Sequence, residues 1–147
     1  MKFAKALLIA ASFPISASAE VTVSQPWARA SILASRPGAA YLTLSSDTDD
    51  RLLSASTPVA AQVMIHAAET DAGGVSRMMH LEMLDLPAGK TVTFFPGSMH
   101  LMLMGLADKL EEGASFPLTL TFEETGDVTV EVPVLGIAAT GPEATDK

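Results

Sequence analysis

Beyond residue 20 the sequence is a series of short runs in which apolar and polar residues alternate, and no long segment has the apolar spacing of a helix. A period of two places successive side chains on opposite faces of a strand. Clusters of Gly, Pro, Asp and Ser separate the runs and indicate turns. The expected strands are 21–24, 39–46, 51–57, 62–67, 75–84, 90–95, 100–106, 116–122 and 127–134. Because many short strands separated by turns are typical of sandwiches and barrels, we predict an all-β antiparallel fold.

The length of 147 residues predicts one domain, preceded by an export signal. Residues 1–19 have a basic start, an apolar middle and small residues before position 20, which is the layout of a secretory signal peptide. The domain is expected over 20–137, and the small and charged residues of 138–147 predict a flexible tail. The sequence contains no asparagine and hence no glycosylation sequon, so we expect export to a bacterial periplasm.

Charge and composition exclude several classes of protein. Loss of Lys2 and Lys5 with the signal changes the net charge from −8 to −10, and the remaining basic residues form no cluster, which disfavours nucleic acid as a partner. No stretch after the signal approaches the roughly 20 apolar residues of a membrane span. With no cysteine, the chain offers neither disulfides nor a residue for a lipid anchor. It also lacks the G-x-S-x-G, H-E-x-x-H and P-loop motifs, and we predict that it is not an enzyme.

Histidine and methionine are concentrated in one part of the chain. All three histidines and seven of the eight methionines lie between residues 64 and 104: His66, His80, His100, Met64, Met78, Met79, Met83, Met99, Met102 and Met104. Thioether sulfur is a soft, uncharged donor, and a mixed His/Met set suits Cu(I) better than Zn²⁺, Ca²⁺ or Mg²⁺. The alternative explanation is core packing, since methionine fills irregular interiors well.

The run from 100 to 104 favours a metal site. On a strand, His100, Met102 and Met104 share one face, while the two intervening leucines point to the other and form the core. A half-exposed face with one imidazole and thioethers is suited to a soft metal. Met104, deeper along the strand, is more typical of packing than of a ligand, and Met99 falls on the leucine face.

The run from 75 to 84 leaves two options open. Met78 and His80 share one face of this strand and Met79 takes the other, so either set could join a site. The turn over 71–74 predicts a hairpin that places this strand beside 62–67, which carries His66. A lone histidine is more often a surface or hydrogen-bonded residue than a ligand, so His80 is left outside the candidate set.

At these residues the sequence resembles the periplasmic copper chaperones of the PCu(A)C type. That family carries a histidine, ten residues, a methionine, twenty-one residues and then His-x-Met. Here eleven residues separate His66 from Met78, and twenty-one separate Met78 from His100. Met102 then completes the His-x-Met part of the pattern. The turn over 71–74 is the natural place for the extra residue. Further family signatures occur in family order: Pro26-Trp27-Ala28-Arg29-Ala30, Ala39-Ala40-Tyr41-Leu42-Thr43-Leu44, Leu86-Pro87-Ala88-Gly89 and His100-Leu101-Met102-Leu103-Met104-Gly105-Leu106.

The resemblance implies a cupredoxin-like Greek-key β-sandwich that binds Cu(I) through His66, Met78, His100 and Met102. It also implies delivery of copper for cytochrome c oxidase maturation, either to an oxidase subunit or to a thiol-bearing assembly factor. Copper storage or tolerance, and a metal-free interaction module, are the alternatives. An electron-transfer cupredoxin is excluded, because the blue-copper centre requires a cysteine thiolate. The tail beyond residue 140 contains no His or Met, so a second copper site there is not expected.

Overall fold

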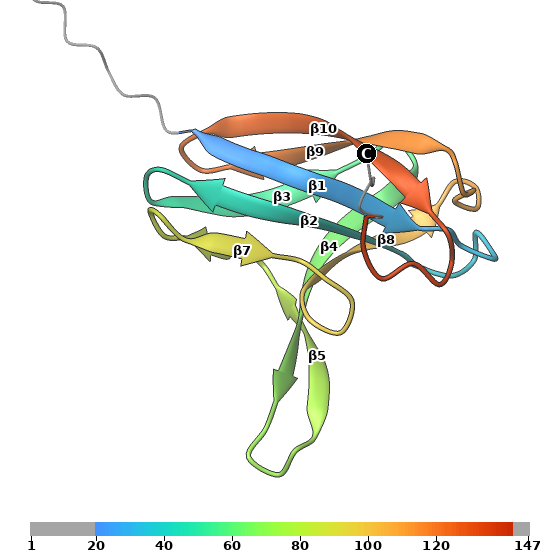
Figure 1. The fold of residues 1–147 in the computed structure, drawn as a ribbon, viewed down its shortest axis with the longest axis horizontal. Helices are drawn as coiled ribbons and strands as arrows, with labels where there is room; N and C mark the ends of the chain where they lie inside the picture. Colours follow the sequence, from blue (N-terminus) through green and yellow to red (C-terminus); the bar gives the residue numbers. More distant parts are fainter. Residues whose placement is uncertain (1–19, 143–147) are drawn as a thin grey trace, which may run out of the picture.

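Ten strands and no helix make up residues 20–142, the part of the chain that the computed structural model describes (Figure 1). The expected signal peptide over 1–19 lies outside the described residues, as do positions 143–147. The strands are β1 (Val21–Arg29), β2 (Gly38–Ser46), β3 (Asp50–Ser56), β4 (Ala60–Thr70), β5 (Ser76–Leu81), β6 (Leu84–Leu86), β7 (Thr91–Thr93), β8 (His100–Leu106), β9 (Ser115–Phe122) and β10 (Gly126–Leu135). The all-β prediction is confirmed.

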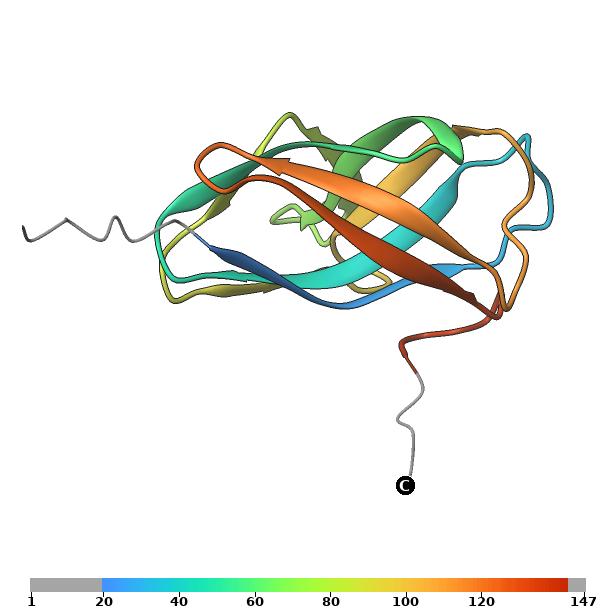
Figure 2. The same ribbon diagram turned by 90° about the horizontal axis from the view of Figure 1, so that it is seen from above.

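The strands form one continuous path of pairings that folds into two layers. The order is β5-β4-β8-β2-β1-β10-β9-β3-β6, with β7 pairing β2 off this path. Most of β10 pairs antiparallel with β9, but its last residues, Val134 and Leu135, pair parallel with the end of β1. This parallel pair is the exception among the described strands, whose other pairings are antiparallel. Because β10 serves both layers, it joins them along one side, and the ribbons enclose the interior (Figure 2).

The interior is filled by the alternate residues that the period of two selects. On β9, Phe116, Leu118, Leu120 and Phe122 are buried while the residues between them are more exposed. Strand β8 contributes Leu101 and Leu103, both completely buried. Burying a leucine or phenylalanine side chain stabilises a fold by about 1.5–3 kcal/mol, so these strands hold the layers together. The prediction that the two leucines of β8 point into the core is confirmed.

Several predicted strands differ from the observed ones at their ends, for example 62–67, which is β4 over Ala60–Thr70, and two differ by more. The run expected over 75–84 is two strands, β5 in the layer of β4 and β6 paired with β3 in the other layer. Strand β1 continues past residue 24 to Arg29, because an irregularity between Ser24 and Trp27 shifts its register on β2. Gln25 adopts a positive φ of 50° at that point. A bulge allows a strand to continue where strict alternation fails, and single-sequence periodicity does not reveal it.

The outer part of the β4–β5 hairpin extends from the sandwich as an arm, defined here as residues 67–79 (Figure 1). Residues 68–80 are exposed. The hairpin pairing predicted from the turn is confirmed, with Thr70 opposite Ser76. Inside the turn, Asp71 Oδ1 accepts hydrogen bonds from the amides of Gly73 and Val75 at 2.9 and 3.0 Å. Strand β4 pairs with β8 only as far as His66, which lies opposite His100, the first residue of β8. Beyond this pair β4 continues with β5 alone, and the arm begins there.

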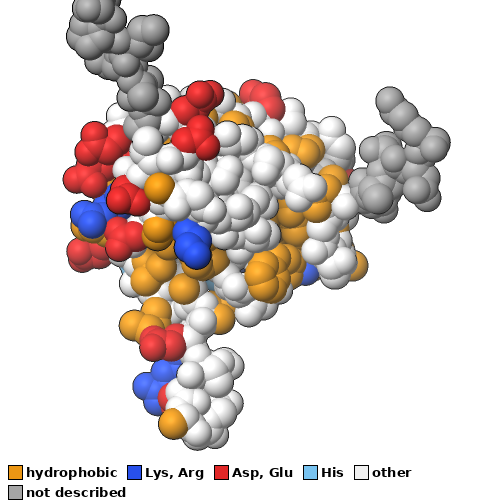
Figure 3. Space-filling view, turned by 60° about the vertical axis from the view of Figure 1, so that its left-hand side comes forward, with side chains coloured by type: hydrophobic (Ala, Val, Ile, Leu, Met, Phe, Trp, Pro, Cys, Tyr) orange, Lys and Arg blue, Asp and Glu red, His pale blue; other side chains and the backbone are white. Residues whose placement is uncertain are grey.

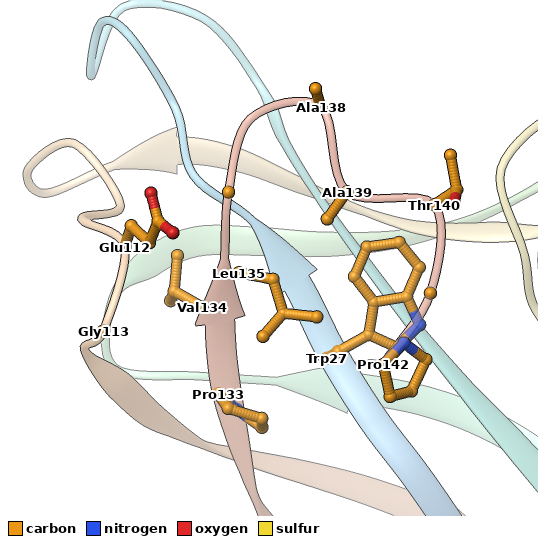
Figure 4. A pocket seen from close by; sticks show the side chains of 12 residues that line it. Trp27, Glu112, Gly113, Pro133, Val134, Leu135, Ala138, Ala139, Thr140 and Pro142 are labelled. Atoms are coloured by element: carbon orange, nitrogen blue, oxygen red, sulfur yellow. The ribbon is translucent and has the colours of Figure 1, made fainter. Parts of the chain in front are cut away.

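The segment after β10 lies against the first strand. Arg29 Nε donates a 2.7 Å hydrogen bond to the carbonyl oxygen of Ala139, so this part of the expected tail is tied to β1. Figure 4 shows residues 138–142 bordering an open pocket together with Trp27. The Trp27 indole stacks on the Tyr41 ring with centroids 4.5 Å apart. Residues 20–142 include no helix long and apolar enough to cross a membrane.

Candidate metal centre

The three histidines stand in one row across three neighbouring strands. His66 on β4 is the register partner of His80 on β5 and of His100 on β8. Register partners project from the same face of a sheet, so the rings meet side by side. The ring centroid of His66 lies 5.9 Å from that of His80 and 5.4 Å from that of His100. The row therefore crosses the base of the arm, at the last rung that β4 and β8 share.

His66, in the middle of the row, has the environment of a ligand. Both of its ring nitrogens are buried and have no hydrogen-bond partner among the described residues. Burial lowers the pKa of this imidazole below its usual value of 6.5, and the neighbouring His80 lowers it further. A buried nitrogen without a partner is unfavourable. A neutral imidazole with a free lone pair is also what a metal ion requires.

His100 is the more buried neighbour, with 8% of its surface exposed. Burial lowers the pKa of its imidazole, His66 adds to this effect, and a hydrogen bond with the Ser98 backbone opposes it. The pKa of both imidazoles thus lies below 6.5, which favours their neutral form at pH 7. They differ from an ordinary surface pair, whose imidazoles would be hydrated and free to take up protons.

The methionines divide between the two faces of this sheet. Met64 and Met102 are register partners one rung inward from His66 and His100, and all four lie on one face. Met104 lies on the same face, opposite Gln62. Met99 packs against the hydrophobic core, as predicted, whereas Met104 does not, so its assignment to packing is wrong. Alternation alone explains the division, since odd and even positions of β8 face opposite ways.

Met78, the fourth member of the predicted set, lies farther out. It is the register partner of Ala68, one rung beyond the histidine row, and its side chain is on the face that carries the histidines. It belongs to the arm and is 54% exposed. The structure therefore brings His66, His100 and Met102 together and places Met78 on the same face but at a distance. Met79 points to the other face of the arm.

Besides Met104, two donors on this face were not assigned from the sequence: His80 and Met64. The hairpin register could have found His80, because closing the turn over 71–75 puts it opposite His66. Met64 shares the parity of His66 on β4, and only the register of β8 on β4 places it beside Met102. Within the described part of the chain, no three His, Asp or Glu side chains are arranged to hold a metal ion together.

Other surface features do not contain these donors. The pocket beside Trp27 is lined mainly by apolar side chains and backbone, together with Glu112 and Thr140. At the end of the sandwich where the turns after β2, β6 and β9 meet, acidic side chains surround a shallow depression, and Figure 3 shows acidic side chains gathered at one end of the molecule. Asp50 in this depression is buried, but its carboxylate accepts four hydrogen bonds from the protein and is satisfied.

A family model described as "Putative lipoprotein LpqE-like" matches residues 21–134, from the start of β1 to the penultimate residue of β10. The chain belongs to this family. The match takes in all the histidines and methionines discussed above. The resemblance to the PCu(A)C family drawn from the sequence is therefore confirmed.

Solved structures of family members share the fold. The apo PCuAC domain of PmoF2 is 25% identical, with a TM-score of 0.68 over 82% of this chain and 94% of that domain. The Cu(I) form of DR1885 from Deinococcus radiodurans is 32% identical, with a TM-score of 0.59 over 77% of this chain and 78% of that protein. The predicted fold class is confirmed by these solved structures.

A curated relative, "Putative lipoprotein Lxx21020" of Leifsonia xyli subsp. xyli, is 32% identical over 83 residues. The match covers 56% of this chain and 50% of that protein. The chain thus spans about half the length of this curated relative.

Proposed function

We propose that this protein binds one Cu(I) ion on the face that carries the histidine row and delivers it to another protein. The observation that carries the proposal is His66: its two ring nitrogens are buried without a hydrogen-bond partner among the described residues, and His100 and Met102 lie on the same face of the neighbouring strand. A ligand set of His66, Met78, His100 and Met102 supplies two imidazoles and two thioethers. Such neutral, soft donors favour Cu(I).

Exposure of the site supports transfer rather than permanent storage. Met78 is half-exposed on the arm, so an acceptor can reach this end of the site while His100 stays buried on β8. The solved relative DR1885 has been determined with Cu(I) bound, which supports the same metal here. Since nothing in this arrangement requires chemistry on an organic substrate, we propose a binding role and not an enzymatic one.

We propose that the protein works in the periplasm, with residues 1–19 removed on export and the domain over 20–137. The layout of residues 1–19 supports this, as does the lipoprotein description of the family. Fractionation of cells followed by mass spectrometry of the protein tests it. A polypeptide that begins at Glu20 in the periplasmic fraction is expected, and an intact Met1 in the cytoplasm would contradict it.

The copper proposal is tested by titrating the purified protein with Cu(I) under reducing conditions against a competing chelator. A one-to-one complex is expected, and its absence would refute the proposal. It would favour the alternative of a metal-free interaction module, in which the methionines serve only to pack or to contact a partner.

Delivery for cytochrome c oxidase maturation is the role we propose for the transferred copper. The copper-loaded protein is mixed separately with the copper-binding domain of an oxidase subunit and with a thiol-bearing assembly factor, and the metal in each is measured after separation. Transfer to either is expected. If neither gains copper and removal of the protein makes cells copper-sensitive, a role in copper storage or tolerance replaces this proposal.

A further inference from the structure

The β4–β8 ladder places two rungs of metal donors next to each other. One rung pairs His66 with His100, and the adjacent rung on the same face pairs Met64 with Met102. Partners on neighbouring strands are about 5 Å apart, and successive rungs of one face are separated by roughly 7 Å. Two imidazoles and two thioethers thus stand at the corners of one small rectangle on two strands of the sandwich.

Met78 is much farther from Met102 than Met64 is. On a flat ladder, Met78 and Met102 are two strands and two rungs apart, which is roughly 16 Å at ordinary sheet spacings. The arm has to curl toward β8 before both thioethers can bind one ion. Met64 needs no such movement, because it lies on the strand next to Met102.

The surroundings of Met64 also differ from those of a packing methionine. Its side chain is partly exposed and does not pack against the hydrophobic core, whereas Met99 does. Strand β2 lies on the other side of β8 from β4, and there the register partner of Met102 is Ala39. The side chain of Ala39 is a single methyl group, so it takes up little of the space next to Met102. A methionine has three rotatable bonds and can direct its sulfur toward a neighbouring rung.

We propose that Met64 is a copper ligand, so that His66, His100, Met64 and Met102 together complete a four-coordinate Cu(I) site on the sandwich, and Met78 on the arm is a thioether that can replace one of these donors. This inference rests on the proposed function. It has a consequence for transfer: when Met78 or a donor of the acceptor replaces one ligand, the remaining donors of the ladder still hold the ion, and copper does not escape into solution during exchange.

The test compares Met64→Leu, Met78→Leu and the double variant with the unmodified protein. Leucine has nearly the volume of methionine but no sulfur, so folding should be preserved, and thermal unfolding checks this. Cu(I) affinity is measured by chelator competition, and X-ray absorption counts the sulfur atoms bound to copper. Met104→Leu is the matched control, because Met104 is partly exposed on the same face of β8 but stands opposite Gln62.

We expect Met64→Leu to weaken Cu(I) binding by about tenfold or more and to remove one sulfur from the copper site. Met78→Leu should still form a one-to-one complex, and the double variant should bind more weakly than either single one. The inference is overturned if Met64→Leu changes neither affinity nor sulfur count, or if Met104→Leu loses as much. Absence of a complex in the unmodified protein would refute the proposed function itself. Failure of the Met64 inference and failure of the copper-binding proposal therefore give different results.

Discussion

His66 and His100 are partners in the last rung that β4 and β8 share, and their ring centroids lie 5.4 Å apart. Beyond this rung β4 continues only with β5, as the arm. The proposed site therefore lies between the paired β4–β8 ladder of the sandwich and an exposed part that a partner protein can reach. This division explains how one face could hold copper and also release it.

The two faces of β8 should respond differently to truncation. We expect His100→Ala and Met102→Ala each to weaken Cu(I) binding by about tenfold or more, which corresponds to about 1.4 kcal/mol. Met99→Ala should leave affinity nearly unchanged, because Met99 packs against the core. Chelator competition on the three folded variants checks this. Equal losses at positions 99 and 102 would show that the proposed ligand face is wrong.

Copper affinity should begin to fall at a lower pH than the pKa of free histidine would suggest. Burial lowers the pKa of both His66 and His100 from 6.5, so protons begin to compete with copper only at more acidic pH. Affinity should fall as the pH drops through the lowered pKa values, so the break in a plot of log affinity against pH should lie below pH 6.5. Chelator competition at a series of pH values measures this, and a break at or above pH 6.5 would contradict it.

Replacing Gly105 of β8 is expected to lower the free energy of unfolding more than replacing a glycine in an open turn. It has a φ of +63°, and an added Cβ would lie 2.9 Å from the Cβ of Ala61 on β4. Gly74 in the turn of the arm has a φ of +81° with nothing within 4 Å of an added Cβ. Gly74→Ala should therefore cost only backbone strain, about 1–2 kcal/mol, and Gly105→Ala clearly more. Urea unfolding of both variants provides the comparison, and similar losses would argue against close β4–β8 packing.

The buried carboxylate of Asp50 should make stability fall at low pH. Burial raises the pKa of this group, but hydrogen bonds from the Thr125 hydroxyl and three backbone amides lower it by more, so the net pKa is below 3.8. Those amides belong to Glu124, Arg51 and Thr125. The native state then holds fewer protons than the unfolded chain. The contribution of ionised Asp50 to the free energy of unfolding is therefore complete above about pH 3.8, and it disappears as the pH falls through the lowered pKa.

Asp50→Asn should accordingly reduce the free energy of unfolding by about 1–3 kcal/mol at pH 7, because hydrogen bonds to the charged group are lost. The difference from the unmodified protein should shrink at pH values below the ordinary pKa of 3.8. Asp47→Asn is the control, since Asp47 is exposed in the neighbouring turn. Unfolding curves at neutral and acidic pH measure both, and a loss at Asp50 that is independent of pH would contradict the electrostatic explanation.

Much of the architecture could be predicted from alternation and turn residues. The all-β class and the opposite directions of His100 and Leu101 follow from a period of two, which is a local property of a strand. The pairing of β4 with β5 follows from the turn over 71–74. The family could be predicted as well, because its histidine and methionine spacing is written directly in the sequence. What was missed locally, the bulge in β1 and the split of 75–84 into β5 and β6, depends on which strand each segment pairs with.

By itself the sequence determined which donors exist and which side of its strand each one occupies. Only the tertiary structure decided which donors are neighbours. The register of β4 on β8 and β5 placed His80 beside His66 and Met64 beside Met102, and it left Met78 on an arm beyond the histidine row. Register is set by long-range pairing and by burial of one face in the core. Residues as far apart in the chain as Met64 and Met102 therefore meet for a reason that no short window of sequence contains.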